Sequence, residues 1–572
     1  MKGTRAIIIS IFIHGLFISL LAGLAYMQIV RAKYYGDLSR NNYIRVLPLE
    51  APRGVIYDRN GVKIADNILS FDLVLLPREI KALPADIERL ADALSLNRVE
   101  LAGRIAAAKN VFEPLVIKSN IGKSEAIAIE EKTAGLAGIT VNTRPLRSYP
   151  YPSASSALGY LGRLAEDELP RLKRYGYTAR DLVGRSGLEE YYDSYLKGTS
   201  GGIQTEVDSR GRLRRVLGYK DPVKGKDIYT TIDARLQKAA AEALEGNNGA
   251  VIIMNPGSGE ILAIMSSPAY DSNAFVRSNK ATVKHYIDSK DRPLFNRAIS
   301  GEYPPGSTFK AVVAQAALEN KKMSADESLE CTGAYNFSGQ NFKCWKEGGH
   351  GYQNVKQAIT HSCNVYFYKV GRMLGAEAIY KEADAFGFGR KSDIDLPYER
   401  PGLLPSPTWK AKNKKARWYD GDTVNFSVGQ GFLLATPLQV LRMMSASAAG
   451  GRLARPYLVY KIEDFDVSSR YAETVDISSG VTKTIKDALR NVVADESGTG
   501  RKAAVTGVDI AGKTGTAQAS KGRPHAWFTG FAPVKEPKVA LVVLLEHGGK
   551  GGSNASMIAG KLFSVARDLG YL

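Results

Sequence analysis

The strongest constraint on how this chain can fold is a run near its N-terminus, from Ala6 to about Tyr26, that contains no Asp, Glu, Lys or Arg. About 21 residues of α-helix, rising about 1.5 Å each, span about 31 Å, close to the thickness of a bilayer core. We therefore expect a transmembrane anchor at residues 6–30. A cleaved signal peptide is the alternative, because small residues stand at 23–25, but the apolar run exceeds a typical signal core.

Basic residues flank this run on both sides, Lys2 and Arg5 before it and Arg31 and Lys33 after it, so counting charges does not decide its orientation. A short basic head before a first apolar run usually stays inside the cell. We expect residues 1–5 to form a cytoplasmic tail. Because no second run of this length follows, the rest of the chain should lie in one aqueous compartment outside the cytoplasm.

The composition indicates a folded and mostly soluble remainder. Of 572 residues, 44% are hydrophobic and 24% are charged, which is near the globular average and excludes a wholly disordered, collagenous or coiled-coil protein. The formal net charge of +19 favours anionic surroundings. Outside the cytoplasm these are lipid headgroups or wall polymer, and nucleic acid is not expected. Three cysteines are too few for a disulfide scaffold in a chain of this length.

A polar, turn-rich segment at residues 221–226 predicts a domain boundary. Residues 31–220 combine short β-rich runs with two helical stretches and no concentration of catalytic residue types, as expected of a non-catalytic domain. Beyond the boundary, strands precede and follow helices, which predicts an α+β domain at 221–572. Within it, residues 249–255 and 259–265 have the pattern of an antiparallel hairpin.

Ser307 and Lys310 form the first candidate chemical motif. A rigid Tyr-Pro-Pro-Gly turn precedes Ser307 and a helix-favouring segment follows Lys310, so the serine is expected at a helix N-terminus. There the backbone N–H groups favour a developing oxyanion, and a lysine with a depressed pKa can take the serine proton without a histidine. Taken alone the pair is weak evidence, because an N-cap serine and a surface lysine are the commoner explanation.

Two further polar groups strengthen the hypothesis. Ser362-Cys363-Asn364 lies in a stretch expected to be helical, where a hydroxyl and an amide can hydrogen-bond the nucleophile, the lysine or a substrate amide. The segment 513–516, Lys-Thr-Gly-Thr, stands ahead of strand-like apolar runs, as if on the first strand of an edge sheet. There the lysine and hydroxyls would bind a substrate carboxylate and lower the pKa of Lys310, and the glycine would leave room for the ligand.

All three elements in this order resemble the Ser-x-x-Lys, Ser-x-Asn and Lys-Thr-Gly signature of penicillin-recognising serine acyltransferases. The chain resembles a class B penicillin-binding protein, and most closely the elongation-type penicillin-binding protein 2 family, over nearly its whole length. The matching segments besides the anchor are residues 53–61, 187–189, 296–298, 303–310, 428–431, 435–439 and 511–518.

The resemblance implies a penicillin-binding transpeptidase domain at 221–572, an antiparallel sheet flanked by helices as in beta-lactamases, and an elongated β-rich pedestal at 31–220. It implies a peptidoglycan D,D-transpeptidase that cross-links stem peptides through a serine acyl-enzyme during cell elongation and is inhibited by beta-lactams. A D,D-carboxypeptidase side activity is compatible, since geometry decides whether water or an amine takes the acyl group. No cofactor is expected for catalysis.

The resemblance also assigns roles at the nucleophile. It implies that Ser307 attacks the carbonyl carbon of the penultimate D-Ala, that Lys310 is the general base and that Ser362 relays the proton. Asn364 would position the amide on the acyl side.

On the substrate side, Lys513 and Thr514 are expected to hold the terminal carboxylate, next to Gly515. The backbone N–H groups of Ser307 and Thr516 are expected to form the oxyanion hole.

Location and partners are implied in the same way. The protein is expected as a single-pass protein of the bacterial cytoplasmic (inner) membrane, with a cytoplasmic N-terminus and a periplasmic catalytic domain. No glycosyltransferase-sized domain separates anchor and pedestal. A multi-pass SEDS-type glycosyltransferase and other elongation-complex membrane proteins are therefore expected partners, together with membrane lipid and stem peptides on lipid-linked or nascent glycan.

The three cysteines gather with one histidine, in the order Cys331, Cys344, His350 and Cys363, separated by 12, 5 and 12 residues. Three thiolates and an imidazole suit tetrahedral zinc, which would be structural because four protein ligands leave no open position. A disulfide with one spare thiol and three buried apolar cysteines are the alternatives. His361 is a competing nitrogen ligand. Some elongation-type members resemble this chain in carrying metal ligands in the same segment.

Two other functions compete with this interpretation. Residues 507–514 satisfy the phosphate-loop pattern of an NTPase, but such a loop must open a helix, and this one reads as a strand. A catalytically silent penicillin-binding scaffold or sensor that activates a partner glycosyltransferase keeps the fold and loses the reaction. The presence of every motif residue disfavours it.

Overall fold

The computed structural model describes residues 2–36, 44–75, 84–94, 96–107, 115–134, 136, 138–178, 181–207, 213–468, 471–519 and 521–572. The chain forms two compact units. Unit 1 comprises Met1–Arg53, Asn67–Leu146 and Lys197–Gly225, and unit 2 comprises Gly54–Asp66, Arg147–Leu196 and Lys226–Leu572. Unit 2 therefore takes two segments from the N-terminal half of the chain.

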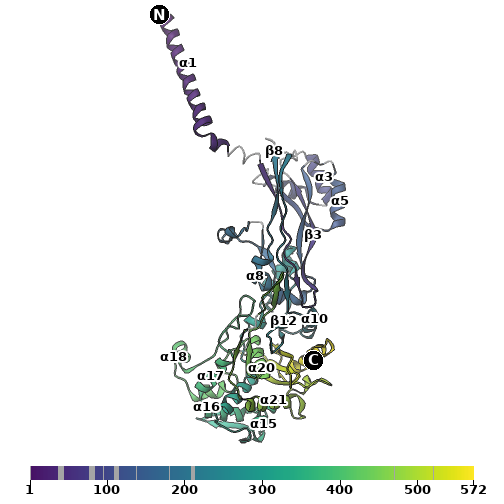
Figure 1. Cartoon of the computed structure of the whole chain (residues 1–572), viewed down its shortest axis with the longest axis vertical. Coiled ribbons are helices and arrows are strands. Elements are labelled where there is room, and N and C mark those ends of the chain that lie inside the picture. The colour runs from purple at the N-terminus through teal and green to yellow at the C-terminus, as the bar shows by residue number, and fades with distance from the viewer. Residues whose placement is uncertain are drawn as a thin grey trace. The chain divides into compact units, whose positions relative to one another are not determined.

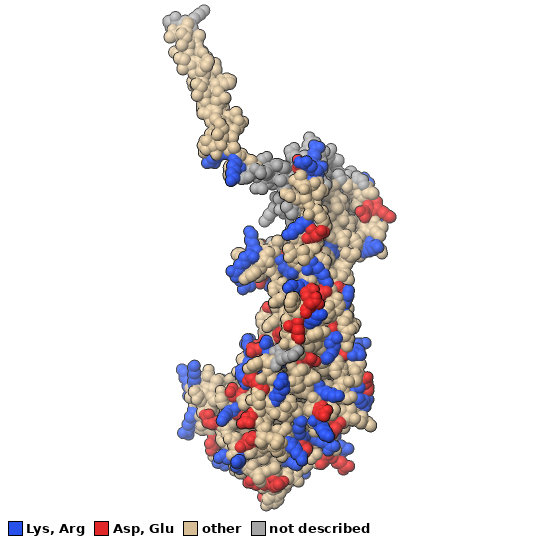
Figure 2. Space-filling model, in the orientation of Figure 1, with Lys and Arg blue, Asp and Glu red and all other residues tan. Residues whose placement is uncertain are grey.

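The apolar run near the N-terminus is helical. Helix α1 (Lys2–Ala25) continues into a π-helical turn, Tyr26–Val30 (Figure 1). The segment Ala6–Val30 has a mean hydropathy of 2.4 and is long and apolar enough to cross a membrane. Figure 2 shows a stretch of this helix without charged side chains, followed by Lys and Arg at its C-terminal end. The helix expected from the sequence is thus present.

Unit 1 is built mainly from antiparallel strands. Strands β1 (Ile44–Leu49), β8 (Gly201–Val207) and β9 (Leu213–Lys220) form one sheet in that order. In a second sheet, β3 (Lys63–Leu75) pairs with β4 (Leu115–Ile121) and β5 (Ile139–Ser148). Three helices cover the second sheet, and their leucines and isoleucines share a buried core with it. These helices are α3 (Pro84–Leu94), α4 (Arg98–Ala106) and α5 (Lys123–Thr133).

The centre of unit 2 is a five-stranded antiparallel sheet in the order β12-β11-β23-β22-β21. The five strands are β11 (Gly249–Met254), β12 (Ile261–Ser267), β21 (Ala511–Ala517), β22 (His525–Ala532) and β23 (Val539–Leu545). Every residue of β11, β12 and β23 is buried, which is the pattern of strands covered by helices on both faces. The hairpin predicted at 249–265 is confirmed by the pairing of β11 with β12.

Helices pack on both faces of this sheet. Alternate strand residues, among them Val251, Phe528 and Val543, share a buried cluster with α10 (Ala234–Ala243) and α22 (Asn554–Asp568). The residues of α13 (Arg297–Ser300) and α20 (Pro437–Ala448) contact the sheet and lie outside that cluster, so they cover its other face. The predicted α+β class, an antiparallel sheet flanked by helices, is confirmed.

A helical layer adjoins β21, the edge strand of the sheet. Helix α21 (Ser479–Ala494) contacts β21, α15 and α14, and α14 also packs on α16 and α17. The bounds of these helices are α14 (Lys310–Glu319), α15 (Val355–Thr360), α16 (Asn364–Leu374) and α17 (Ala376–Ala385). All α14 residues from Lys310 to Ala317 are buried, so α14 is the central helix of this layer. Two small two-stranded antiparallel sheets border it, β13 (Leu329–Cys331) with β16 (Gly351–Gln353), and β14 (Ala334–Phe337) with β15 (Gln340–Lys343).

The N-terminal segments of unit 2 are joined by a buried ion pair. Arg147 donates from Nε to the Glu189 carboxylate at 2.7 Å and from Nη1 to the carbonyl of Gly54 at 2.7 Å. Both charged side chains are almost fully buried, 2% and 0% exposed. Loss of either partner would leave a buried charge, which costs roughly 3–5 kcal/mol. Arg147 thus links the two sequence motifs at 53–61 and 187–189, because it bonds one residue of each.

The remaining elements of unit 2 are short. They are β2 (Ile56–Tyr57), α6 (Ser155–Leu158), β6 (Leu161–Arg163), α7 (Leu169–Leu172), β7 (Leu182–Gly184), α8 (Gly187–Tyr191), α9 (Asp193–Leu196), β10 (Ile228–Thr230), α11 (Asn273–Val276), α12 (Lys280–Asp288), α18 (Pro407–Lys414), α19 (Asp420–Phe426), β17 (Arg452–Ala454), β18 (Val459–Ile462), β19 (Phe465–Asp466) and β20 (Ala472–Thr474).

Candidate active site and cysteine cluster

Ser307 lies in a 3-10 turn, Gly306–Phe309, that leads directly into α14. The serine is half-buried, and its hydroxyl makes no hydrogen bond within the part of the chain that the structure describes. The turn is packed against the edge strand, since a Cβ on Gly306 would lie 2.9 Å from the carbonyl oxygen of Thr516. Gly306 has φ +55, a conformation that glycine adopts at little cost. The predicted helix N-terminus is therefore a tight 3-10 turn, and the glycine in it allows the edge strand with Thr516 to pack closely.

Lys310 opens α14 three residues later and is completely buried. Its Nζ donates to the carbonyl oxygen of Ser362 at 2.9 Å and to the amide oxygen of Asn364 at 2.6 Å, and lies 3.4 Å from the Ser362 hydroxyl. Lys310 is thus brought together with two residues that lie 52 and 54 positions later in the sequence. The ammonium also lies 5.5 Å from the centre of the Phe367 ring.

Ser362 is not helical, in contrast to the expectation for 362–364. It has φ +54, and it stands just past the end of α15. Its N–H donates to the carbonyl of Ile359 and the next N–H, of Cys363, donates to that of Ala358. These are the two hydrogen bonds of a Schellman cap, in which the left-handed position is usually glycine. A serine in this conformation costs roughly 1 kcal/mol relative to glycine, and its hydroxyl lies 3.4 Å from the Nζ of Lys310.

Asn364 is the first residue of α16, and the Cys363 sulfur caps that helix by accepting from the N–H of Tyr366 at 3.5 Å. The Asn364 side chain has its oxygen on Lys310 and its nitrogen 3.4 Å from the carbonyl of Lys343. An amide held at both ends has a fixed orientation.

The segment Lys513 to Thr516 lies in β21, the edge strand next to the Ser307 turn. Lys513 is fully buried and donates to the carbonyl of Thr514 at 3.0 Å. The Thr514 hydroxyl donates to that of Thr499 at 2.9 Å. A Cβ on Gly515 would lie 3.0 Å from the carbonyl oxygen of Pro305, so this glycine makes room for the Ser307 turn. The predicted room for a ligand is therefore occupied, at least in part, by the protein itself.

Burial sets the electrostatics of the two lysines. Removal from water lowers the pKa of Lys310 to about 8. The pKa of Lys513 falls well below its ordinary value, first because of burial and second because of the positive charge of Lys310. We expected the second lysine to lower the pKa of Lys310, whereas burial is the cause there. With a pKa of about 8, roughly a tenth of the Lys310 side chains are neutral at pH 7.

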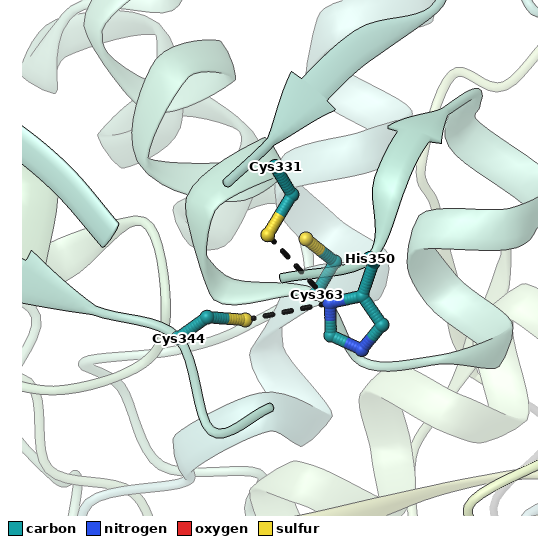
Figure 3. A group of neighbouring side chains, drawn as sticks. All are labelled: Cys331, Cys344, His350 and Cys363. Carbon is teal, nitrogen blue, oxygen red and sulfur yellow. Dashed lines mark hydrogen bonds between the residues drawn. The ribbon is translucent and has the colours of Figure 1, made fainter. Parts of the chain in front are cut away.

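The expected cysteine cluster is also assembled. The ligand atoms of Cys331, Cys344, His350 and Cys363 all lie within 4.8 Å of one another. Figure 3 shows the sulfur atoms gathered around Nδ1 of His350, which is 3.7 Å from the Cys331 sulfur and 3.5 Å from that of Cys344. Hydrogen bonds from Cys363 and His350 lower the pKa of Cys344, and so favour a thiolate. All three cysteines are free of disulfides.

His361 lies outside this cluster. Its Nδ1 is 2.6 Å from the amide oxygen of Gln353 and its Nε2 is 2.9 Å from the hydroxyl of Ser497. Both ring nitrogens are therefore engaged elsewhere, and His350 is the nitrogen ligand available to a metal.

The phosphate-loop interpretation is wrong. Such a loop must end at the start of a helix, whereas the Lys-Thr pair lies in strand β21, hydrogen-bonded along β22. The segment cannot present free N–H groups of a helix N-terminus to a nucleotide.

Two residues of this region were not identified from the sequence. Trp345 donates from its indole N–H to the carbonyls of His361 and Ser362, at 3.0 and 3.2 Å. Thr499 holds the Thr514 hydroxyl. No sequence signal marks Thr499, because it comes from a loop 15 residues earlier. The position of Trp345, next to a predicted metal ligand, was the available signal for it.

Two family models match this chain. The model described as "Penicillin binding protein transpeptidase domain" matches residues 249–564, and the model described as "Penicillin-binding Protein dimerisation domain" matches residues 48–230. The chain is 34% identical over 560 residues to the peptidoglycan D,D-transpeptidase MrdA of Acinetobacter baumannii, covering 93% of this chain and 83% of that protein. It is 32% identical over 565 residues to MrdA of Escherichia coli, covering 93% and 89%.

Solved structures are similar as well. A complex between penicillin-binding protein 2 and MreC from Helicobacter pylori matches with 30% identity and a TM-score of 0.81, over 92% of this chain and 99% of that one. Pseudomonas aeruginosa penicillin-binding protein 2 in complex with WCK 5153 matches with 31% identity and a TM-score of 0.70, over 91% and 96%.

Proposed function

This chain belongs to the elongation-type penicillin-binding protein 2 family of peptidoglycan D,D-transpeptidases, and we propose that Ser307 is its acylating nucleophile and Lys310 its general base. The enzyme is a serine-type D-Ala-D-Ala transpeptidase. The observation that carries the assignment of Lys310 is its burial against Ser362 and Asn364, one turn after Ser307. A buried amine with neutral hydrogen-bond acceptors is poised to accept a proton at neutral pH.

In the first half-reaction the Ser307 oxygen bonds to the carbonyl carbon of the penultimate D-Ala, and its proton passes to the neutral amine of Lys310. The carbonyl oxygen becomes an oxyanion, held by the N–H groups of Ser307 and Thr516. The bond to the terminal D-Ala then breaks. Its nitrogen takes the proton back from Lys310 through the Ser362 hydroxyl, and an ester on Ser307 remains.

In the second half-reaction an amine of a neighbouring stem peptide attacks this ester. Lys310 accepts the amine proton and returns it to the departing oxygen of Ser307, which restores the free enzyme. Water in place of the amine gives the carboxypeptidase reaction at the same residues.

We assign the recognition of the substrate to the edge strand and to Asn364. Lys513 and Thr514 hold the terminal carboxylate, beside Gly515, and Asn364 positions the amide on the acyl side. The support for the strand's role is that the buried ammonium of Lys513 has only a carbonyl, that of Thr514, as hydrogen-bond partner among the described residues, so it keeps donors for an incoming anion.

We further propose that Cys331, Cys344, His350 and Cys363 hold a structural zinc ion. The donor set and its compact arrangement fit the metal, and the favoured thiolate at Cys344 is the form that binds it. Nδ1 is the ring nitrogen of His350 that faces the sulfurs, 3.7 Å from that of Cys331 and 3.5 Å from that of Cys344, so it is the ligand atom. Bound zinc would cross-link the segment 331–363 beside the active site. It would take part in no step of the reaction.

The protein is a single-pass protein of the bacterial inner membrane. We propose that residues 1–5 are cytoplasmic, residues 6–30 the anchor, residues 31–220 a non-catalytic pedestal and residues 221–572 the transpeptidase domain outside the cytoplasm. This orientation is supported by the basic head and by the substrate, which is cross-linked outside the cytoplasm.

Peptidoglycan is the substrate, and we propose that glycan polymerisation comes from a SEDS-type glycosyltransferase. The related Helicobacter pylori protein is in complex with MreC. We propose an equivalent partner for this chain among other elongation-complex proteins, together with membrane lipid.

The direct test is release of D-Ala from a synthetic pentapeptide donor by the detergent-solubilised full chain, with and without an amine acceptor. We expect release to require Ser307 and a cross-linked product to form only with the acceptor. If the Ser307→Ala variant releases D-Ala at the wild-type rate, the nucleophile is wrong. If the wild-type protein, like the Ser307→Ala variant, releases no D-Ala from the pentapeptide donor, the chain is a catalytically silent scaffold.

A further inference from the structure

Trp345 and Lys310 share one hydrogen-bond acceptor, the carbonyl oxygen of Ser362. The Lys310 ammonium lies 2.9 Å from this oxygen and the indole nitrogen of Trp345 lies 3.2 Å from it. A carbonyl oxygen has two lone pairs, so both donors can be accepted at once. The indole N–H also reaches the carbonyl of His361 at 3.0 Å.

The shared carbonyl belongs to a peptide that needs support. Ser362 occupies the left-handed position of the α15 cap, with φ +54, where a non-glycine residue is strained. The carbonyls of the last helical turn and of the cap lack partners within the helix. A second donor on the Ser362 oxygen stabilises the strained orientation that presents this oxygen to Lys310.

The indole also contacts a second part of the fold. Its ring meets that of His350 edge-on, with centres 5.3 Å apart, and the preceding Cys344 N–H donates to the carbonyl of Gly333 at 2.8 Å. These contacts restrain the backbone and the ring of Trp345 in addition to its hydrogen bonds to residues 361 and 362. The ring nevertheless remains 58% exposed, so its packing contributes little to the core.

We propose that Trp345 is a positioning residue for the transpeptidase reaction. Its indole N–H holds the Ser362 peptide in the orientation that places the Lys310 amine for proton transfer. The inference rests on the proposed role of Lys310 as the general base. It attributes to Trp345 a function in the chemical step and none in binding the substrate.

The test is the substitution Trp345→Phe, which keeps an aromatic ring but removes the N–H donor together with the second ring of the indole. Acylation of the full-length protein by a fluorescent penicillin is followed by stopped flow over a range of concentrations, which separates the acylation rate constant from the dissociation constant of the initial complex. We expect the rate constant to fall about 5- to 10-fold, as for loss of one hydrogen bond, and the dissociation constant to stay within about twofold.

The matched control is Trp418→Phe. Trp418 also uses its indole N–H, which donates to the hydroxyl of Thr423 at 2.8 Å, but it makes no hydrogen bond to Ser362. We expect that variant to acylate at the wild-type rate. An unchanged acylation rate constant in Trp345→Phe, or a change confined to the dissociation constant, would overturn the inference.

A folding defect would not leave the question open. If Trp345→Phe is unfolded by circular dichroism, the residue is replaced by benzothienyl-alanine, which has the shape of tryptophan and lacks the N–H. The same loss of rate is expected there. The Ser307→Ala variant tests the nucleophile separately, because a penicillin adduct on that variant would refute the assignment of Ser307. A normal acylation rate in the Trp345 variants would refute only the positioning role of Trp345.

Discussion

The Nζ of Lys310 lies 2.6 Å from the amide oxygen of Asn364, so the buried lysine is held by a neutral side chain. Within the described residues no carboxylate forms an ion pair with Lys310. A neutral acceptor orients the ammonium without the full stabilisation that an opposite charge would give it. Burial therefore remains the main influence on the pKa of Lys310, which it lowers to about 8.

Substituting Asn364→Asp should therefore impair acylation although the shape is nearly unchanged. A carboxylate in contact with the ammonium favours the charged form and raises the pKa of Lys310, typically by one unit or more. We expect acylation by a beta-lactam at neutral pH to fall at least about tenfold. The matched control is Asn336→Asp, an exposed position of β14. Equal rates in wild type and Asn364→Asp would refute the role of the neutral acceptor.

The pH dependence of acylation should follow Lys310. Burial lowers its pKa to about 8, and only the neutral amine accepts the Ser307 proton. The acylation rate constant should therefore rise about tenfold per pH unit well below pH 8 and level off above it. The measurement uses a beta-lactam that does not titrate between pH 6 and 10. A rate that is flat from pH 6 to 9 would contradict the assignment.

At Ser362 the residue that best suits the backbone conformation should not be the one that best supports acylation. Glycine suits the left-handed cap better, so Ser362→Gly should be more stable to unfolding than Ser362→Ala by roughly 0.5–1 kcal/mol. Both variants lack the hydroxyl 3.4 Å from Lys310 and should acylate slowly. Urea unfolding and penicillin acylation on the same samples provide the comparison. A fully active Ser362→Gly protein would show that the hydroxyl is dispensable.

Metal content should depend on His350 and not on His361. The wild-type protein should contain about one zinc ion per chain, measured by elemental mass spectrometry. The His350→Gln variant should lose the zinc, and its melting temperature should fall by roughly 5 °C. His361→Gln is the control, because that ring bonds Gln353 and Ser497. Equal zinc in the two variants would contradict the ligand assignment.

Glu382, a largely buried acid of α17 that contacts α14, should make the free energy of unfolding depend on pH. Burial raises the pKa of Glu382 to about 7, and its neutral neighbour Gln315 donates to it at 2.6 Å. Because the folded pKa is raised, this contribution to stability is complete below about pH 4.5 and is lost as pH rises through about 7.

The variant Glu382→Gln should abolish that dependence. Between pH 5 and 8 the wild type should lose up to about 2 kcal/mol more than the variant. Glu377→Gln, an exposed acid in the first turn of the same helix, should behave like the wild type. Parallel curves for wild type and Glu382→Gln would refute the shift.

Local signals explain which features could be predicted from the sequence. The apolar run dictates α1, and the continuous apolar strands around 251 and 542 dictate a sheet covered on both faces. The Pro-Pro-Gly turn before Ser307 and the strand character around Lys513 act over a few residues each, so they were recognisable without tertiary information.

Features that depend on distant contacts could not be predicted. The left-handed cap at Ser362 contradicts its local helical pattern, and the tertiary fold alone brings the serine hydroxyl within 3.4 Å of Lys310. The sequence already favoured His350 over His361, because Cys363 stands close to His361, but it could not show that His361 bonds Gln353 and Ser497. Nor could the sequence show that Gly515 accommodates the turn before Ser307.

The central claim, that Ser307 is acylated, is tested most directly by intact-mass spectrometry of the full chain after incubation with a beta-lactam. The account predicts one covalent adduct per chain, mapped to the peptide that contains Ser307 and absent from the Ser307→Ala variant. Folded wild-type protein without an adduct, or an adduct that persists in the variant, would contradict it.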